Sequence, residues 1–187
     1  MDEAQEVLQF WFGTPPGERR VAWFQKDPMF DEAIRARFLP LHNRAAQGRL
    51  DTWKAAPASA LALVIVTDQF PRNLFRGSAR AFSTDPLALS AAEHIVKEGW
   101  DKRMLPVERQ FVYLPFEHSE SLEVQERSLA LYAPLTKFAD TPDATDYARR
   151  HWEIIKRFGR FPHRNAALGR PSTPEETEFL KQPGSGF

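Results

Sequence analysis

The sequence has no cysteine among its 187 residues, and this absence excludes several kinds of chemistry. Disulfide bridges, thiolate nucleophiles and zinc–thiolate sites all require cysteine. A chain of this length buries a core without disulfides, and 42% of its residues are hydrophobic. The missing cysteines also fit a reducing compartment.

Long apolar runs are lacking as well. The longest, Ala60–Val66, has seven residues, whereas a membrane-spanning helix needs about 20. The first residues, MDEAQE, are acidic where a secretory signal peptide is basic, and no apolar segment follows them. We therefore expect a cytoplasmic protein without a membrane partner.

Familiar catalytic and nucleotide-binding motifs are missing too. The chain contains no Gly-x-Ser-x-Gly, no Gly-x-x-x-x-Gly-Lys and no Gly-x-Gly-x-x-Gly. We predict no cofactor. No two histidines have the i, i+4 spacing of zinc-binding helices, so we also predict no metal. No motif decides whether the protein is an enzyme or which oligomer it forms.

The chain has no excess of charge of either sign, with 25 basic and 25 acidic residues. Locally, residues 149–170 contain seven cations and a single acid, Glu153. Together with Trp152, Phe158 and Phe161 they resemble a surface that stacks on nucleic acid. Since these aromatic residues fall mostly on the spacing of a buried helix face, we do not expect nucleic acid as a partner.

The features that are present indicate helices. Four pairs place a capping oxygen before a proline suited to the first helical turn: Asp27-Pro28, Asp85-Pro86, Thr141-Pro142 and Thr173-Pro174. Thr173 also has Glu176 three residues later, which is a capping box. These signals and the apolar spacing predict helices over residues 2–12, 28–47, 57–70, 86–98, 106–117, 120–138, 142–158 and 174–182.

Apolar residues recur at helical spacing along three of these segments. The stripes are Phe30, Ile34, Phe38, Leu41 and Ala45; Val124, Leu131, Leu135 and Phe138; and Tyr147, His151, Ile154 and Phe158. His151 is therefore interpreted as a core histidine. The segment ALALVIVTD has the β-branched content of a strand, but no other segment offers a partner strand. We predict an all-α single domain over residues 1–187, with about eight helices and a loose tail at 183–187.

Polar residues gather in three segments. In TDQFPRNLFRG (67–77) they are Asp68, Gln69, Arg72 and Asn73, and the four-residue spacing predicts an ion pair between Asp68 and Arg72. In ERQFVYLPFEHSE (108–120), Arg109, Tyr113 and Glu117 fall on one helix face. His118 then lies between Glu117 and Glu120, either as an acid–base pair or as a histidine bridging two helices.

The third polar segment, FGRFPHRNAALGRPSTPEE (158–176), repeats the Phe-Pro-Arg-Asn core of the first. It contributes Arg160, His163, Arg164 and Asn165. Arginine provides planar paired donors for carboxylate or phosphate, and histidine titrates near neutral pH. The same residues would also fix a loop to the core by buried bonds to carbonyl groups. The sequence leaves both interpretations open.

Four blocks of the chain are similar to a known family. They are WFQKDPMFDEAI (23–34), LALVIVTDQFPRNLFRG (61–77), ERQFVYLPFEHSE (108–120) and FGRFPHRNAALGRPSTPEETEFL (158–180). With these blocks the chain resembles the bacterial domain of unknown function family numbered 924. The resemblance implies a tetratricopeptide-like fold of stacked helical hairpins and no established activity. The sequence itself has no 34-residue repeat.

These observations lead to three functional hypotheses. The first is a polar pocket for a small anionic ligand or an acidic peptide end, built from the three polar segments. Its residues would be Asp68, Gln69, Arg72, Asn73, Arg109, Tyr113, Glu117, Glu120, Arg160, Arg164 and Asn165. The second is an enzyme that uses this pocket with His118 or His163 as general acid or base. The third is a structural or protein-interaction module.

Overall fold

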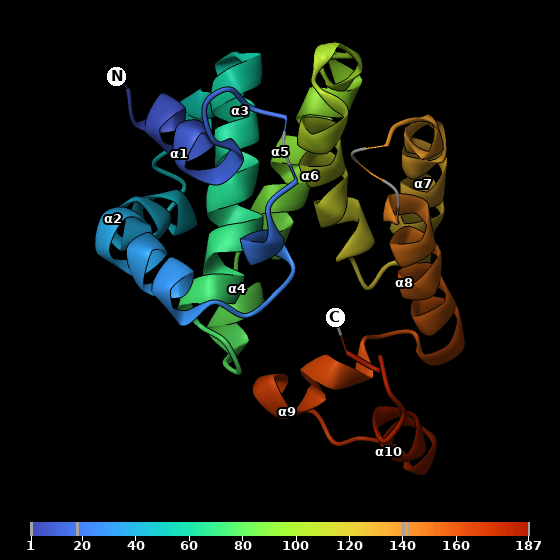
Figure 1. Cartoon of the computed structure of the whole chain (residues 1–187). Helices are drawn as coiled ribbons and strands as arrows, with labels where there is room; N and C mark the ends of the chain where they lie inside the picture. Colours follow the sequence, from blue (N-terminus) through green and yellow to red (C-terminus); the bar gives the residue numbers. More distant parts are fainter. Residues whose placement is uncertain (1, 18, 140, 142, 187) are drawn as a thin grey trace.

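The computed structural model describes residues 2–17, 19–139, 141 and 143–186, and the regular structure within them is helical throughout (Figure 1). The prediction of an all-α fold is confirmed. The helices are α1 (Glu3–Phe12), α2 (Pro28–Ala46), α3 (Pro57–Val64), α4 (Phe70–Leu74), α5 (Asp85–Lys97), α6 (Pro106–Glu117), α7 (Leu122–Tyr132), α8 (Ala144–Phe158), α9 (Asn165–Leu168) and α10 (Pro174–Leu180). Short 3-10 segments include Ala79–Phe82 and Pro162–Arg164.

Two of the four predicted caps form as expected. The Asp27 carboxylate accepts the N–H groups of Met29 and Phe30 at the start of α2. Thr173 and Glu176 form the predicted capping box of α10. Such bonds satisfy N–H groups that have no partner within the helix.

The other two pairs differ from the prediction. Asp85 is the first residue of α5, and its carboxylate is bonded to arginine side chains instead of the helix end. Thr141 donates its hydroxyl to the carbonyl of Leu135, 3.0 Å away. Pro142, where we expected the next helix to begin, lies outside the described residues, and α8 begins at Ala144.

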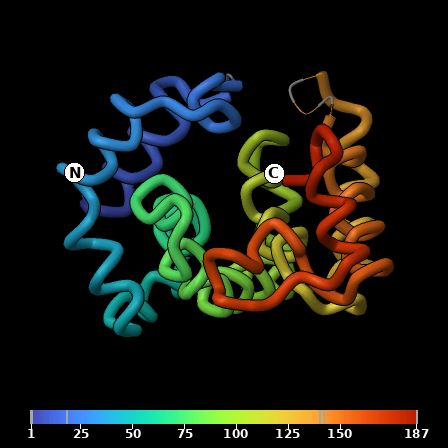
Figure 2. The backbone as a smooth tube through the Cα atoms, turned by 90° about the horizontal axis from the view of Figure 1, so that it is seen from below, coloured from blue at the N-terminus to red at the C-terminus, as the bar shows by residue number. Residues whose placement is uncertain are grey.

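From α1 to α8, each helix packs against a helix one or two places away in the chain. Contacts join α1 to α3, α2 to α4, α3 to α5, α5 to α6, α6 to α7 and α7 to α8. Figure 2 shows α1 and α2 on one side of the molecule and α8 and α10 on the other, with α3–α6 between them. In the α5–α8 part, successive helices pack as stacked hairpins require. The tetratricopeptide-like superhelix remains a prediction.

Helix α3 runs through the core. Every residue of the apolar run Ala60–Val66 is at most 4% exposed, so the run belongs to a helix that is buried on all sides, and the choice of helix over strand is confirmed. A second, smaller apolar cluster lies in the C-terminal part, where Phe158 and Phe179 pack against Ile154, Ile155 and Phe161. Within the described residues, no helix is long and apolar enough to cross a membrane.

The predicted apolar stripes are buried to different degrees. All five stripe residues of α2 are buried. In the second stripe Phe138 is exposed, and the buried face of that region consists of Gln125, Ser128, Tyr132 and Leu135. Gln125 is buried because its amide donates to the carbonyls of Glu117 and Ser119, at 2.6 and 2.7 Å. In the third stripe Tyr147 is exposed.

The end of the chain returns to α8. Of the residues expected to form a loose tail, Gly184 accepts a hydrogen bond from Nη2 of Arg150 through its carbonyl, at 3.2 Å. The Ser185 hydroxyl donates to the carbonyl of Leu180. Phe187 lies outside the described residues.

Candidate functional site

The site begins at a distortion in the long helix that contains α3 and α4. Between them, Ile65–Gln69 form a π-helical segment, in which the N–H of Phe70 reaches the carbonyl of Ile65, five residues back. Single π turns within α-helices are frequent at functional sites. Asp68 and Gln69, two residues of the first polar segment, lie on this turn.

Side chains from outside the helix complete its hydrogen bonds. Pro71 has no N–H, so it gives no α-helical bond to the carbonyl of Thr67, four residues earlier. The Thr84 hydroxyl donates to that carbonyl at 2.6 Å, and Nδ1 of His42 lies 3.0 Å from the carbonyl oxygen of Val66. Because buried carbonyls need partners, these bonds stabilise the distorted turn.

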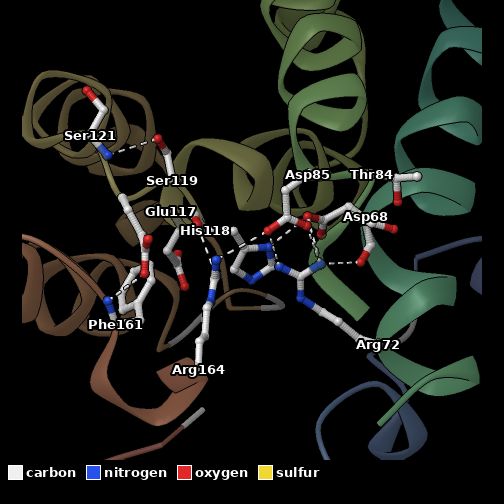
Figure 3. Close-up of polar contacts among 12 residues, drawn as sticks. Asp68, Arg72, Thr84, Asp85, Glu117, His118, Ser119, Ser121, Phe161 and Arg164 are labelled. Carbon is white, nitrogen blue, oxygen red and sulfur yellow. Dashed lines mark hydrogen bonds and ion pairs between the residues drawn. The ribbon is translucent and has the colours of Figure 1, made fainter. Parts of the chain in front are cut away.

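Asp68 is a fully buried carboxylate with three partners (Figure 3). Its Oδ1 lies 2.7 Å from Nδ1 of His118 and 3.4 Å from Nη1 of Arg72. Its Oδ2 accepts the amide of Gln69 at 2.6 Å. Burial raises the pKa of Asp68, but the Arg72 guanidinium and His118 outweigh burial and hold the pKa well below its usual range. Asp68 is therefore ionised at neutral pH, and the predicted ion pair with Arg72 is present.

Asp85 joins two arginines from distant parts of the chain. Arg72 donates to it through both terminal nitrogens, at 2.9 and 3.1 Å. Arg164 donates to the same carboxylate at 3.3 Å and to the carbonyl of His118 at 3.0 Å. In the sequence, Asp85 has the pattern of a helix cap. No local pattern distinguishes a cap from a partner of Arg164, which is 79 residues away.

The guanidinium of Arg164 makes fewer hydrogen bonds to the described residues than that of Arg72. Its side chain is 7% exposed, and its buried Nε has no hydrogen-bond partner among the described residues. Burial and the neighbouring Arg72 guanidinium lower the pKa of Arg164 to about 10, against the opposing effect of Asp85. The two guanidinium groups share Asp85, and Arg72 is also paired with Asp68, so two carboxylates lie beside the two cations.

Glu117 and His118 end α6, next to the arginines. Burial, with a smaller contribution from Asp68, raises the pKa of Glu117 to about 8, although the Tyr132 hydroxyl lowers it. Its Oε1 lies 3.1 Å from Nδ1 of His151, and its buried Oε2 makes no hydrogen bond to the described residues. Glu117 is therefore protonated at pH 7.

The histidines of this region are neutral at pH 7. Burial lowers the pKa of His118, as does Arg72, and Asp68 only partly opposes them. Burial lowers the pKa of His151 still further and that of His163 to about 4. His118 pairs with Asp68, so the partner expected from its neighbours Glu117 and Glu120 is replaced by one 50 residues away. His151 is buried as predicted, but it lies beside Glu117 and belongs to the polar cluster.

These side chains line a cleft of about 740 Å³. Seven of the residues singled out from the sequence contribute to its surface, namely Gln69, Arg72, Asn73, Glu117, His118, His163 and Arg164. Asp68 lies behind them, where it fixes Arg72 and His118. The remaining walls come from residues 19–26, from the segment between α4 and α5, from α6, from the start of α8 and from Gly184 and Gly186.

Arg109 and Tyr113 lie outside the lining of the cleft. Arg109 donates to the Tyr113 hydroxyl at 3.1 Å, and that hydroxyl donates to Asp101 at 2.7 Å. Arg109 and Tyr113 share a helix face with Glu117 in the sequence. In the structure they bond to each other and to Asp101, which precedes α6. They form a separate polar cluster.

The third polar segment is divided between two roles. Arg160 forms a paired interaction with Glu176, at 2.6 and 2.7 Å. Asn165 donates to Glu176 at 3.3 Å. Glu120 accepts two bonds from Arg170 and the N–H of Phe161, at 2.7 to 2.9 Å. Arg160, Asn165 and Glu120 thus fix the loop to the rest of the protein, while His163 and Arg164 line the cleft.

The arrangement bears on metals and nucleic acid as well. Among the described residues, no group of three or more potential ligands is placed to hold a metal ion. The cation-rich stretch 149–170 does not present Phe161 for stacking on a base, because that ring is completely buried. Arg149 and Arg157 of the same stretch are paired with Asp146 and Glu175.

Comparison with known proteins places the whole chain near one family. The model of a family described as bacterial protein of unknown function (DUF924) matches residues 7–184. A solved structure, that of a protein of unknown function from Agrobacterium tumefaciens, is 40% identical in sequence, with a TM-score of 0.86. The match covers 95% of this chain and 96% of that one. No curated protein matches.

Proposed function

This chain belongs to DUF924, a family of bacterial proteins of unknown function, and we propose that its cleft binds a small anion. The anionic group, a carboxylate or a phosphate, contacts the guanidiniums of Arg72 and Arg164. The observation that carries this proposal is the buried Nε of Arg164, a charged donor without a hydrogen-bond partner among the described residues. A buried donor left unpaired costs about 1–3 kcal/mol, and an oxyanion supplies the missing acceptor.

The charges around the cleft favour the same ligand. Six cations line it: Arg19, Lys26, Arg72, Arg76, Arg150 and Arg164. Among the described residues, Asp31, Asp68, Asp85 and Asp143 are paired with cations of this lining. Glu117 adds no charge at pH 7 because its pKa is raised to about 8. Among the described residues that line the cleft, the cations outnumber the acidic side chains, Glu117 and Asp143, and a cleft lined mainly by charge of one sign concentrates ions of the other.

Isothermal titration calorimetry with inorganic phosphate tests the proposal, with acetate titrated in parallel as a mimic of a peptide carboxylate end. We expect saturable binding of one of the two ions at pH 7.5. Arg164→Met keeps the apolar stem and removes the donors, so it should weaken binding by about tenfold or more. The matched control is Arg157→Met, since Arg157 is an exposed arginine of α8 paired with Glu175.

The outcome is decisive in either direction. Absence of saturable binding by both ions at millimolar concentration contradicts the proposal and favours a purely structural role for the arginines. Equal affinities of wild type and Arg164→Met would also contradict it. Thermal melts of both variants establish that each is folded before titration.

A second candidate function, an acid–base enzyme using the same cleft, is favoured by the pairing of His118 with Asp68. When Nδ1–H donates to a carboxylate, the ring is oriented and Nε2 keeps the lone pair of a base. Nearby Glu117 is protonated at pH 7 and is suited to donate a proton. Two carboxyl groups whose surroundings separate their pKa values often divide the roles of acid and base.

The enzyme hypothesis predicts proton exchange with solvent. Small carboxylates and phosphate esters are incubated in deuterium oxide, and loss of carbon-bound protons is followed by NMR. We expect exchange with the wild type and loss of exchange in His118→Asn, which retains phosphate binding. Exchange at an unchanged rate in His118→Asn would remove His118 from the role of base.

A further inference from the structure

We infer that the anion bound in the cleft carries an aromatic ring, which packs against aromatic side chains on the cleft walls. The inference rests on the proposed function, because it names the class of ligand for the same site. It starts from the size of the cleft. About 740 Å³ lies within the range of pockets that enclose whole organic ligands, roughly 300–1,000 Å³, whereas the two arginines contact only an anionic group.

Part of the surface next to the arginines is apolar. The guanidinium of Arg164 lies 4.6 Å from the centre of the Phe82 ring, and that of Arg72 lies 5.7 Å from it. Phe82, Ala81 and Leu114 all line the cleft. An atom bonded to the anionic group therefore has an aromatic ring as its neighbour, and a hydrocarbon group fits this environment better than a hydrated one.

The outer walls carry exposed aromatic rings. Phe24 is 44% exposed and Tyr147 is 41% exposed, and both line the cleft. They come from separate parts of the chain, before α2 and in α8. The third exposed aromatic side chain among the described residues, Phe138, does not line the cleft.

Each of these rings has a cation over its face. The guanidinium of Arg19 lies 4.6 Å from the ring centre of Phe24, and that of Arg150 lies 5.4 Å from that of Tyr147. Arginine planes stack on aromatic ligands as well as on aromatic side chains. A flat ring that enters between these walls covers apolar surface now in contact with water, and aromatic pairs add to that gain. An anion that carries an alkyl group gains less binding free energy, because an alkyl group has no aromatic face to stack.

Three probes test the inference by calorimetry at pH 7.5: inorganic phosphate, methyl phosphate and phenyl phosphate. Phosphate monoesters lose their second proton near pH 6, so both esters are predominantly dianions and differ in the ring. We expect phenyl phosphate to bind about tenfold more tightly than methyl phosphate. Phe24→Ala and Tyr147→Ala should each reduce this ratio, while leaving the affinity for inorganic phosphate unchanged.

Phe138→Ala is the matched control, because it removes an aromatic ring of similar exposure outside the cleft. If none of the three probes binds, the proposed anion site fails and the inference fails with it. If the two esters bind equally well, the anion site stands and the aromatic ligand is rejected. A preference for phenyl phosphate that survives both Phe24→Ala and Tyr147→Ala would reject the walls as its cause.

Discussion

Asp68 and Glu117 are carboxyl groups of one buried cluster, and their surroundings move their pKa values in opposite directions. Asp68 has Arg72, His118 and Gln69 as partners, which favour the charged form. Glu117 has no cation among the contributors to its pKa, and burial dominates. Burial alone therefore does not decide the charge of a carboxyl group; its partners do.

The raised pKa of Glu117 makes stability depend on pH. Its pKa is about 8 in the folded protein, compared with an ordinary value of 4.5. Between these values the folded state holds a proton that the unfolded chain has lost, so the free energy of unfolding falls as pH rises. This pH dependence is absent in Glu117→Gln. We therefore expect the free energy of unfolding of the variant, relative to that of wild type, to increase by at most about 1.4 kcal/mol per pH unit as pH rises.

Urea unfolding at intervals between pH 5 and 9 measures this difference. The lowered pKa values of His118, His151 and His163 have the opposite effect on stability. Their contribution to the free energy of unfolding is lost as pH falls below the pKa that histidine has in the unfolded chain. To a first approximation these histidines contribute equally in wild type and variant. Glu123→Gln, an exposed position of α7, should follow the wild type. Parallel curves for wild type and Glu117→Gln would show that Glu117 is ionised in the folded protein.

At the scale of the element, the helix from Pro57 to Leu74 shows how a sequence tolerates a proline near a buried turn. The chain adopts a π-helical segment before Pro71, and the carbonyls left without backbone donors receive side chains from α2 and from the residue before α5. The distorted turn then carries Asp68 and Gln69. Helix geometry and site geometry are thus stabilised by the same bonds.

Thr84→Val tests this dependence. Valine has nearly the same shape, but it leaves the buried carbonyl of Thr67 without its 2.6 Å donor. We expect a loss of about 1–3 kcal/mol in the free energy of unfolding, measured with urea. The control is Thr177→Val in α10, whose exposed hydroxyl donates to the carbonyl of Thr173 and is readily replaced by water. Equal losses for the two variants would contradict the expectation.

The whole molecule contains one large core and a separate C-terminal cluster. The large core extends from α1 to the start of α8, and the small one joins α8 to α10 through Phe158 and Phe179, whose ring centres lie 5.0 Å apart. Segments with few buried apolar contacts open locally without global unfolding. We therefore expect the residues that connect α10 to the cleft loop to unfold locally at a lower free energy than the large core.

Native-state hydrogen exchange distinguishes the two clusters. In Phe179→Ala we expect faster exchange of the α10 amides and little change in the slowest amides of α3 and α6. In Ile95→Ala, a fully buried residue of the large core, we expect the free energy of global unfolding to fall by about 2–5 kcal/mol. Loss of protection in α3 and α6 upon Phe179→Ala would show that the two clusters unfold as one unit.

The sequence by itself determined most of the helices and most of their ends, although it did not predict α9. Asp27 and Thr173 act through bonds that span two or three residues, and the α2 stripe depends only on helical spacing. Such signals are local, so they are readable without the fold. The same locality explains the error at Asp85, which has the pattern of a cap but is bonded to two arginines.

Only the tertiary structure decided which polar side chains meet. The pairs that build the site join Asp68 to His118 and Asp85 to Arg164, across 50 and 79 residues. Helix packing brings them together, and the competing partners of Arg109, Arg160 and Asn165 hold those residues elsewhere. An arginine or a carboxylate forms the same bonds with a ligand as with the protein, so its residue type alone does not fix its partner. Its position in the folded chain does, because only there are the distances to all possible partners set.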